Sequence, residues 1–392
     1  MKVLRDIGLM FFVLLLTACS SESDSTDTKQ PPVINVYVYA PDKPMITRGD
    51  VGEVSPIGDE SKINNLQIWV FNHDETGNLV SYYSPESVDN LNGSAGVANY
   101  QLSVSEAFAQ AESKPLVDVY VVANAASCGM TFSETTTRAE LEAAMIKKSA
   151  DSDYFGLISL TKDLPAAGLP MSGVLRGVEV GGSSPVYKLQ NVKLTRAVSK
   201  IRFVFCRETP VEGADIKVGI NSVMLNAGMI PNNEYLFLET GENAQPYRVT
   251  GFDTDDATEF LPIVDNQIQT WEDIPKSADP LKYVYQTQSA QDYEDLIEQG
   301  LTVVSPATEA ELKQLGPFYL RESDKQLTGV IKYQKEGESE KTVNFEMKTA
   351  GDFSRNHTWI VYAYYSKSGL VAVTVVLQNW TESSGSHEVY NW

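Results

Sequence analysis

Residues 33–40 read VINVYVYA, a run in which β-branched and aromatic residues alternate with one another. These residue types are enriched in β-strands, where successive side chains point to opposite faces of the sheet. One face of this strand carries Ile34, Val36 and Val38, and burying those three side chains contributes about 5–9 kcal/mol, at about 1.5–3 kcal/mol each. We therefore expect a strand whose aliphatic face belongs to a hydrophobic core.

The same pattern recurs along the rest of the chain and predicts a mainly β fold. Near-alternating apolar residues separated by Gly, Pro, Asn and Asp predict further strands at residues 63–71, 116–123, 192–205, 218–225, 327–333, 343–347, 369–377 and 387–392. Only two helices are expected, one over residues 137–148 that opens with a Thr137–Glu140 capping box, and one over residues 305–316. The simplest arrangement is two antiparallel β-sandwich domains, at 49–195 and 196–392.

The N-terminus has the pattern of an export signal that is later removed. Two basic residues precede an apolar run over residues 7–16, which is too short to span a bilayer, and LTAC follows at residues 16–19. This pattern is typical of a bacterial lipoprotein signal, so residues 1–18 are expected to be cleaved and Cys19 acylated. A polar tether leads to the strand at 33–40, and a turn-forming patch then leads to Arg48 and Gly49, a trypsin-like site. Residues 19–48 would thus form a lipidated propeptide.

Composition excludes several classes of partner. The chain has 392 residues, with 52 acidic against 31 basic, and a formal charge of −21. Residues 1–48 hold five of each sign, so a chain cut after Arg48 would keep the whole imbalance. A surface of this charge repels nucleic acid and anionic lipid. We expect an exported globular body held to a membrane, if at all, by lipid.

Catalytic and metal-binding motifs are missing from the sequence. The three histidines, His73, His357 and His387, do not stand at ligand spacing, and no GxSxG, P-loop or GxGxxG occurs. Residues 253–256 resemble the start of a calcium loop but lack its glycine and distal glutamate. We expect no enzyme, no metal and no cofactor. Besides Cys19, the chain has Cys128 and Cys206, which are predicted either to form a disulfide or to remain buried thiols.

The two ends of the chain complement each other. If the strand at 33–40 left after a cut at Arg48, it would open a groove with an apolar floor and unpaired backbone, a surface that binds strands of other chains. The chain ends HEVYNW, and Val389, Tyr390 and Trp392 make an unusually apolar tail. This tail is either an edge strand of its own domain or a donor that fills the groove of a neighbour. A head-to-tail contact of the second kind does not close, so it makes a filament.

Several segments together resemble the major fimbrial subunit (fimbrillin) family of Bacteroidales bacteria, which builds lipoprotein-derived type V pili. The resemblance rests on the order and spacing of five stretches: LTAC at 16–19, VYVVANA at 119–125, LPMSG at 169–173, LTRAVSKI at 194–201, and RNH at 355–357 before the terminal β run. Membership would imply two transthyretin-like β-sandwich domains and export through the periplasm to the outer membrane as a lipid-anchored precursor. It would also imply cleavage after Arg48 by an arginine-specific protease.

The resemblance further implies how the subunit works and with what. The neighbour's C-terminal strand would occupy the groove left by Ile34, Val36 and Val38, and the partners would be other copies of the chain, anchor and tip subunits and the lipoprotein-processing machinery. A chain with both a cut site and a tail favours a stalk subunit of a cell-surface fimbria that supports adhesion. The alternative is a surface lipoprotein adhesin, at a pilus tip or as a monomer, that binds glycan or protein.

Overall fold

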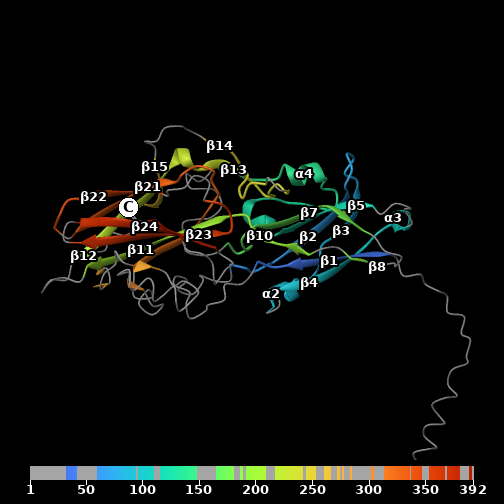
Figure 1. Cartoon of the computed structure of the whole chain (residues 1–392), viewed down its shortest axis with the longest axis horizontal. Coiled ribbons are helices and arrows are strands. Elements are labelled where there is room, and N and C mark those ends of the chain that lie inside the picture. The colour runs from blue at the N-terminus through green and yellow to red at the C-terminus, as the bar shows by residue number, and fades with distance from the viewer. Residues whose placement is uncertain are drawn as a thin grey trace, which may run out of the picture.

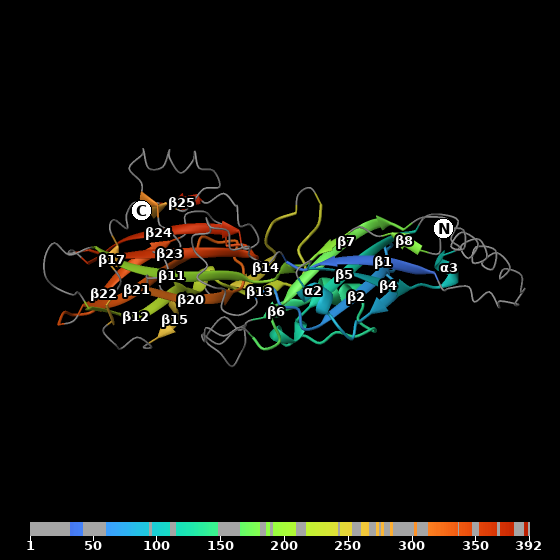
Figure 2. The ribbon, with the colours of Figure 1, turned by 90° about the horizontal axis from the view of Figure 1, so that it is seen from below.

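The alternating segments form strands in the computed structural model, which is mainly β and elongated, with two groups of sheets end to end along its long axis (Figures 1 and 2). The structure describes residues 32–41, 60–93, 96–109, 115–147, 165–180, 186–188, 191–208, 217–241, 244–252, 260–265, 272–273, 276–277, 283–284, 302–303, 313–335, 337–346, 353–366, 369–379 and 388–390. Within these ranges no helix has the length and apolarity needed to cross a bilayer.

Two sheets enclose the first hydrophobic cluster. One has the order β4-β1-β8, with β9 also paired to β1, and comprises β1 (Val33–Tyr39), β4 (Val97–Ser103), β8 (Val186–Lys188) and β9 (Val192–Lys193). The other is antiparallel throughout, with the order β10-β7-β5-β2-β3, and comprises β2 (Leu66–Asn72), β3 (Leu79–Tyr83), β5 (Leu116–Ala123), β7 (Met171–Glu179) and β10 (Thr195–Arg196). Their facing side chains form one core, in which Trp69 and Tyr120 are fully buried.

Two further sheets enclose a second cluster around Phe203, Ile331 and Trp359. One has the order β17-β11-β23-β24-β25, with β20 also on β11, and comprises β11 (Ser199–Glu208), β17 (Lys276–Ser277), β20 (Lys313–Leu320), β23 (His357–Ser366), β24 (Gly369–Asn379) and β25 (Glu388–Tyr390). The other has the order β15-β12-β21-β22, with β16 on β12, and comprises β12 (Lys217–Asn226), β15 (Phe260–Asp265), β16 (Glu272–Asp273), β21 (Thr328–Lys335) and β22 (Lys341–Glu346).

The two clusters meet across a small third sheet and a chain crossing. The sheet is made of β6 (Met145–Lys147), β13 (Pro231–Tyr235) and β14 (Val249–Phe252), so a late hairpin pairs with the first part of the chain. Phe237, just after β13, packs edge-on against Tyr120 with ring centroids 5.1 Å apart. A short parallel pair, β18 (Tyr283–Val284) with β19 (Thr302–Val303), is separate from these sheets. The division into 49–195 and 196–392 stays a prediction.

The predicted single strand at 192–205 is three strands, β9, β10 and β11. The interruption lies around Ala197 and Val198, which are buried in the first cluster, whereas Ile201 and Phe203 are buried in the second. A chain that passes from one core to another must turn its apolar side chains toward a new sheet. The break in the strand therefore marks the crossing between the two cores.

Both predicted helices differ from the structure. The capping box at Thr137 is present, but α4 (Arg138–Glu142) ends early because Met145–Lys147 pairs with β13 as β6. The second predicted helix, at 305–316, lies outside the described residues up to residue 312, and its end is wrong, since residues 313–320 form β20 on β11. A bulge there accommodates Gly316-Pro317 within the strand. The other short helices are α2 (Asp89–Asn92), α3 (Glu106–Ala109), η1 (Ala125–Cys128) and η2 (Ala227–Met229).

Candidate functional site

Strand β1 lies in the interior of its sheet although it stands near the start of the chain (Figure 2). On one side it pairs antiparallel with β4 along its whole length, from Val33 opposite Ser103 to Tyr39 opposite Val97. On the other side it runs parallel to β8 and then to β9, in two separate short ladders. The sheet therefore continues on both sides of β1, and without β1 both neighbouring strands would face an empty position.

The inner face of β1 is part of the first core. Ile34, Val36 and Val38 are each 0% exposed, as the alternation predicts. A departing β1 would uncover the apolar floor beneath these side chains and leave two rows of unpaired backbone groups, on β4 and on β8–β9. The groove that holds β1 (the β1 groove) thus has the chemistry of a strand-binding site.

The connection that follows β1 begins and ends at neighbouring points. The backbone N–H of Leu194 donates to the carbonyl of Tyr39 at 2.9 Å, and Nε of Arg196 donates to the carbonyl of Glu60 at 3.1 Å. Leu194 and Arg196 are two residues apart, so both ends of the connection are anchored to the same short segment. Residues 42–59, which include Arg48 and Gly49, lie outside the described residues.

The tail occupies the edge of its own second half in this structure. Residues Glu388–Tyr390 form β25, which pairs antiparallel with Val375–Leu377 of β24. Val389 and Tyr390 thus stand where the edge-strand alternative puts them, while Trp392 lies beyond the part of the chain that the structure describes, as does Cys19. The β25 ladder spans three registered pairs on one side, whereas that of β1 with β4 spans seven.

A buried polar cluster ties the start of the body to the second half. Nζ of Lys200 lies 2.9 Å from Oε2 of Glu60, and the Tyr319 hydroxyl donates to the other carboxylate oxygen of Glu60. Nη1 of Arg196 donates to Oδ1 of Asn356 at 3.0 Å. Two of the stretches quoted for the family resemblance, 194–201 and 355–357, therefore meet here.

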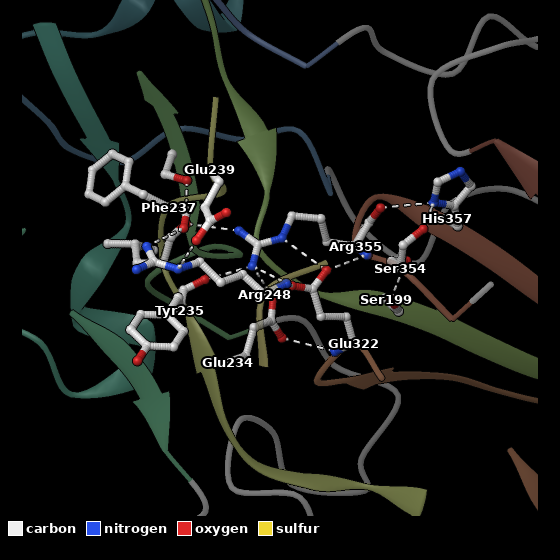
Figure 3. A network of polar contacts seen from close by, with 12 residues as sticks. Ser199, Glu234, Tyr235, Phe237, Glu239, Arg248, Glu322, Ser354, Arg355 and His357 are labelled. Atoms are coloured by element: carbon white, nitrogen blue, oxygen red, sulfur yellow. Dashed lines mark hydrogen bonds and ion pairs between the residues drawn. The ribbon is translucent and has the colours of Figure 1, made fainter. Parts of the chain in front are cut away.

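Arg355 forms a second buried cluster, which Figure 3 shows. Its Nη2 donates to Oε1 of Glu322 at 2.6 Å and to the carbonyl of Tyr235 at 2.6 Å, and its Nη1 donates to the carbonyl of Leu236 at 2.9 Å. Oε2 of Glu234 accepts the backbone N–H of Glu322 at 3.0 Å. One guanidinium thereby joins the loops before β23 and after β20 to the β13 hairpin, which in turn packs on the first core.

Glu234 is the member of this second cluster whose carboxyl group is least well compensated. It is 0% exposed, and its Oε1 lies 3.1 Å from Nη2 of Arg355 without accepting a hydrogen bond there. Burial, together with the nearby Glu322 carboxylate, raises the pKa of Glu234 well above its usual value. The folded protein therefore holds a proton on Glu234 at a pH where the unfolded chain has lost it.

This raised pKa predicts a pH dependence that Glu234→Gln removes. The stabilising effect of the proton is fully present below the unfolded pKa of about 4.3 and is lost as pH rises through the folded pKa. Relative to Glu234→Gln, the wild type should lose unfolding free energy from pH 4.5 upward, as measured by urea denaturation. Glu338→Gln is the control of opposite sign, because hydrogen bonds from Lys341 and Lys335 lower the pKa of that exposed carboxyl. Parallel curves for wild type and Glu234→Gln would refute the assignment.

Among the other polar and sulfur candidates, His73 and Cys128 are described and have structural surroundings. Nδ1 of His73 lies 2.6 Å from Oδ1 of the buried Asp118, whose other oxygen is 3.2 Å from Nη1 of Arg138. Cys128 is a free thiol, and burial raises its pKa to about 12, so it stays protonated at neutral pH. The side chain of Cys206 lies outside those described. Among the described residues, no group of three or more His, Cys, Asp and Glu could hold a metal ion.

Part of the chain matches the model of a known protein family, and several solved structures resemble it. The model of the major fimbrial subunit protein (FimA) family matches residues 34–215, from inside β1 to beyond β11. A candidate cell adhesion protein of Bacteroides eggerthii is 16% identical, with 93% of this chain and 95% of that chain covered and a TM-score of 0.47. A fimbrial assembly protein of Parabacteroides distasonis is 15% identical, with 92% and 99% covered and a TM-score of 0.43.

A fimbrilin of Porphyromonas gingivalis is 12% identical, with 87% of this chain and 92% of that chain covered and a TM-score of 0.42. No curated protein matches the sequence. The match of the family model is therefore the comparison that says most about this chain. Over residues 34–215, somewhat less than half of its length, the chain matches the major fimbrial subunit protein family, which is a family of fimbrial structural subunits.

Proposed function

We propose that this chain is a stalk subunit that polymerises by strand exchange. It is exported as a lipoprotein acylated at Cys19 and is then cut after Arg48 by an arginine-specific protease. After the cut, β1 leaves the body of the subunit. The tail of a second copy, with Val389, Tyr390 and Trp392, then fills the β1 groove. The observation that carries the proposal is the interior position of β1, with Ile34, Val36 and Val38 fully buried between β4 and β8–β9.

The anchors of the connection support a cut that leaves the body intact. Tyr39 belongs to β1 and leaves with it, whereas Glu60 lies beyond the cut and is held by Arg196, so the body keeps this contact after a break at Arg48. Glu60 remains fixed by Lys200 and Tyr319 after such a break. Proteolysis after Arg48 thus separates β1 from the body and leaves the cluster of Glu60, Lys200 and Tyr319 intact.

The unequal ladders support the direction of exchange. β25 pairs with its own domain over three residues and on one side only, so its release breaks few hydrogen bonds. In a neighbour's groove the same tail would gain partners on both sides and an apolar floor. Because the groove and the tail lie on different parts of the subunit, the contact repeats head to tail and extends a filament.

Proteolysis of the purified precursor tests this proposal. An arginine-specific protease should produce a body that begins at Gly49 and forms oligomers whose size grows with protein concentration, as measured by mass spectrometry and light scattering. Arg48→Ala should stay uncut at this position and monomeric under the same conditions. A version without Ser386–Trp392 should be cut normally yet fail to extend. Cut subunits that remain monomers, or normal polymers from the truncated version, would contradict the proposal.

A further inference from the structure

Asn35 is an unusual residue for the middle of β1. It is 7% exposed and stands on the face opposite Ile34, Val36 and Val38, between Gln101 of β4 and Lys188 of β8 in the registered ladders. Its Oδ1 is buried and accepts no hydrogen bond. The backbone of β1, by contrast, is paired along its length with β4.

A buried amide oxygen without a hydrogen-bond partner weakens the binding of the strand that carries it. The oxygen gives up its hydrogen bonds to water when β1 enters the groove and recovers them when β1 leaves. Asn is also among the residues least suited to strands. Asn99 of β4 provides a comparison, because it lies on the same face of the same sheet but is exposed. Its side-chain amide therefore keeps its hydrogen bonds to water.

We propose that Asn35 is the residue that sets how readily β1 leaves its groove, which rests on the strand exchange proposed above. The defect belongs to the departing strand and not to the groove. A strand of a second copy that carries an aliphatic residue at this register enters the same groove without an unpartnered amide. The difference favours replacement of β1 over its rebinding, while the three buried aliphatic residues keep β1 seated until the chain is cut.

The rate at which the N-terminal fragment leaves the protein after proteolysis tests the role of Asn35. Wild type, Asn35→Val and the matched control Asn99→Val are cut after Arg48, and the fraction of the N-terminal fragment still bound is followed in excess synthetic peptide of residues 31–41. Release from Asn35→Val should be about tenfold slower or more, from the usual effect of one unpartnered buried polar group. Asn99→Val should change the rate less than about fivefold, because it alters only cross-strand pairing.

Competition between peptides gives a second measurement that does not depend on how the variants fold. Cut wild-type protein is offered equal amounts of the 31–41 peptide and its Asn35→Val and Asn35→Ala forms. Both substituted peptides should be bound in excess, the Val form by about tenfold or more. Since Ala is a poor strand former, its advantage would reflect the lost amide.

The outcomes separate this inference from the proposed function. Equal release of wild-type and Asn35→Val fragments, or equal binding of the three peptides, overturns the role of Asn35 while strand exchange stands. Retention of every fragment, with no peptide incorporated, overturns the strand exchange itself.

Discussion

Arg355→Leu should lower the unfolding free energy by about 3–5 kcal/mol, because it leaves the buried carboxylate of Glu322 without its cation. It also removes the donors to the carbonyls of Tyr235 and Leu236. The loss should appear in urea denaturation as a lower midpoint, and it should affect both cores because the cluster connects them.

Two further variants identify the cause of this loss. Arg248→Leu is the matched control: Arg248 is a quarter exposed, and its side chain faces Glu239 at 3.7 Å and stacks on Tyr235, so about 1 kcal/mol is expected. Adding Glu322→Gln to Arg355→Leu should recover part of the stability, since the uncompensated charge is then gone. Equal losses for Arg355→Leu and Arg248→Leu would contradict the structural role of the cluster.

Val36→Asp should release β1 without proteolysis. The change places a charge at a position that is 0% exposed and removes about 1.5–3 kcal/mol of apolar burial, so the strand loses more than about 3 kcal/mol of its binding. The uncut precursor should then form concentration-dependent oligomers in light scattering. Backbone amides of Val97–Ser103 in β4 should lose protection from hydrogen exchange.

The adjacent residue provides the control for this prediction. Tyr37 is half-buried and points to the opposite face, so Tyr37→Asp should leave the precursor monomeric. Protection of β12 and β21 in the second core verifies that the Val36→Asp body is folded. A monomeric Val36→Asp precursor with β4 fully protected would mean that β1 is not what closes the groove.

The strands could be predicted from sequence wherever one face is buried. β5 occupies the predicted residues 116–123, and the aliphatic face of β1 is buried as expected, because alternation reports directly on which side chains leave water. The helix ends could not be predicted, since β6 and β20 are fixed by distant partners, β13 and β11. Local propensity for a helix was overridden by pairing.

The buried polar clusters could not be predicted from the sequence, because they too are formed by residues that are distant in the chain. Glu234, Glu322 and Arg355 are far apart in the chain and follow no local pattern, and each looks like an ordinary surface charge. The one available signal was in the stretches quoted for the family resemblance, since 194–201 and 355–357 contain Arg196 and Asn356, which meet in the structure. Asn35 was visible as a polar residue in β1, but the burial of its Oδ1 without a partner, on which the proposed role rests, is seen only in the structure.

The most direct test of the central claim is the N-terminal residue of the protein in assembled fimbriae from the cell surface, determined by mass spectrometry. If β1 is a temporary occupant of its groove, the assembled subunits begin at Gly49 and no peptide from residues 33–40 remains with them. Subunits that begin at Cys19 and retain β1 in the polymer would contradict the account.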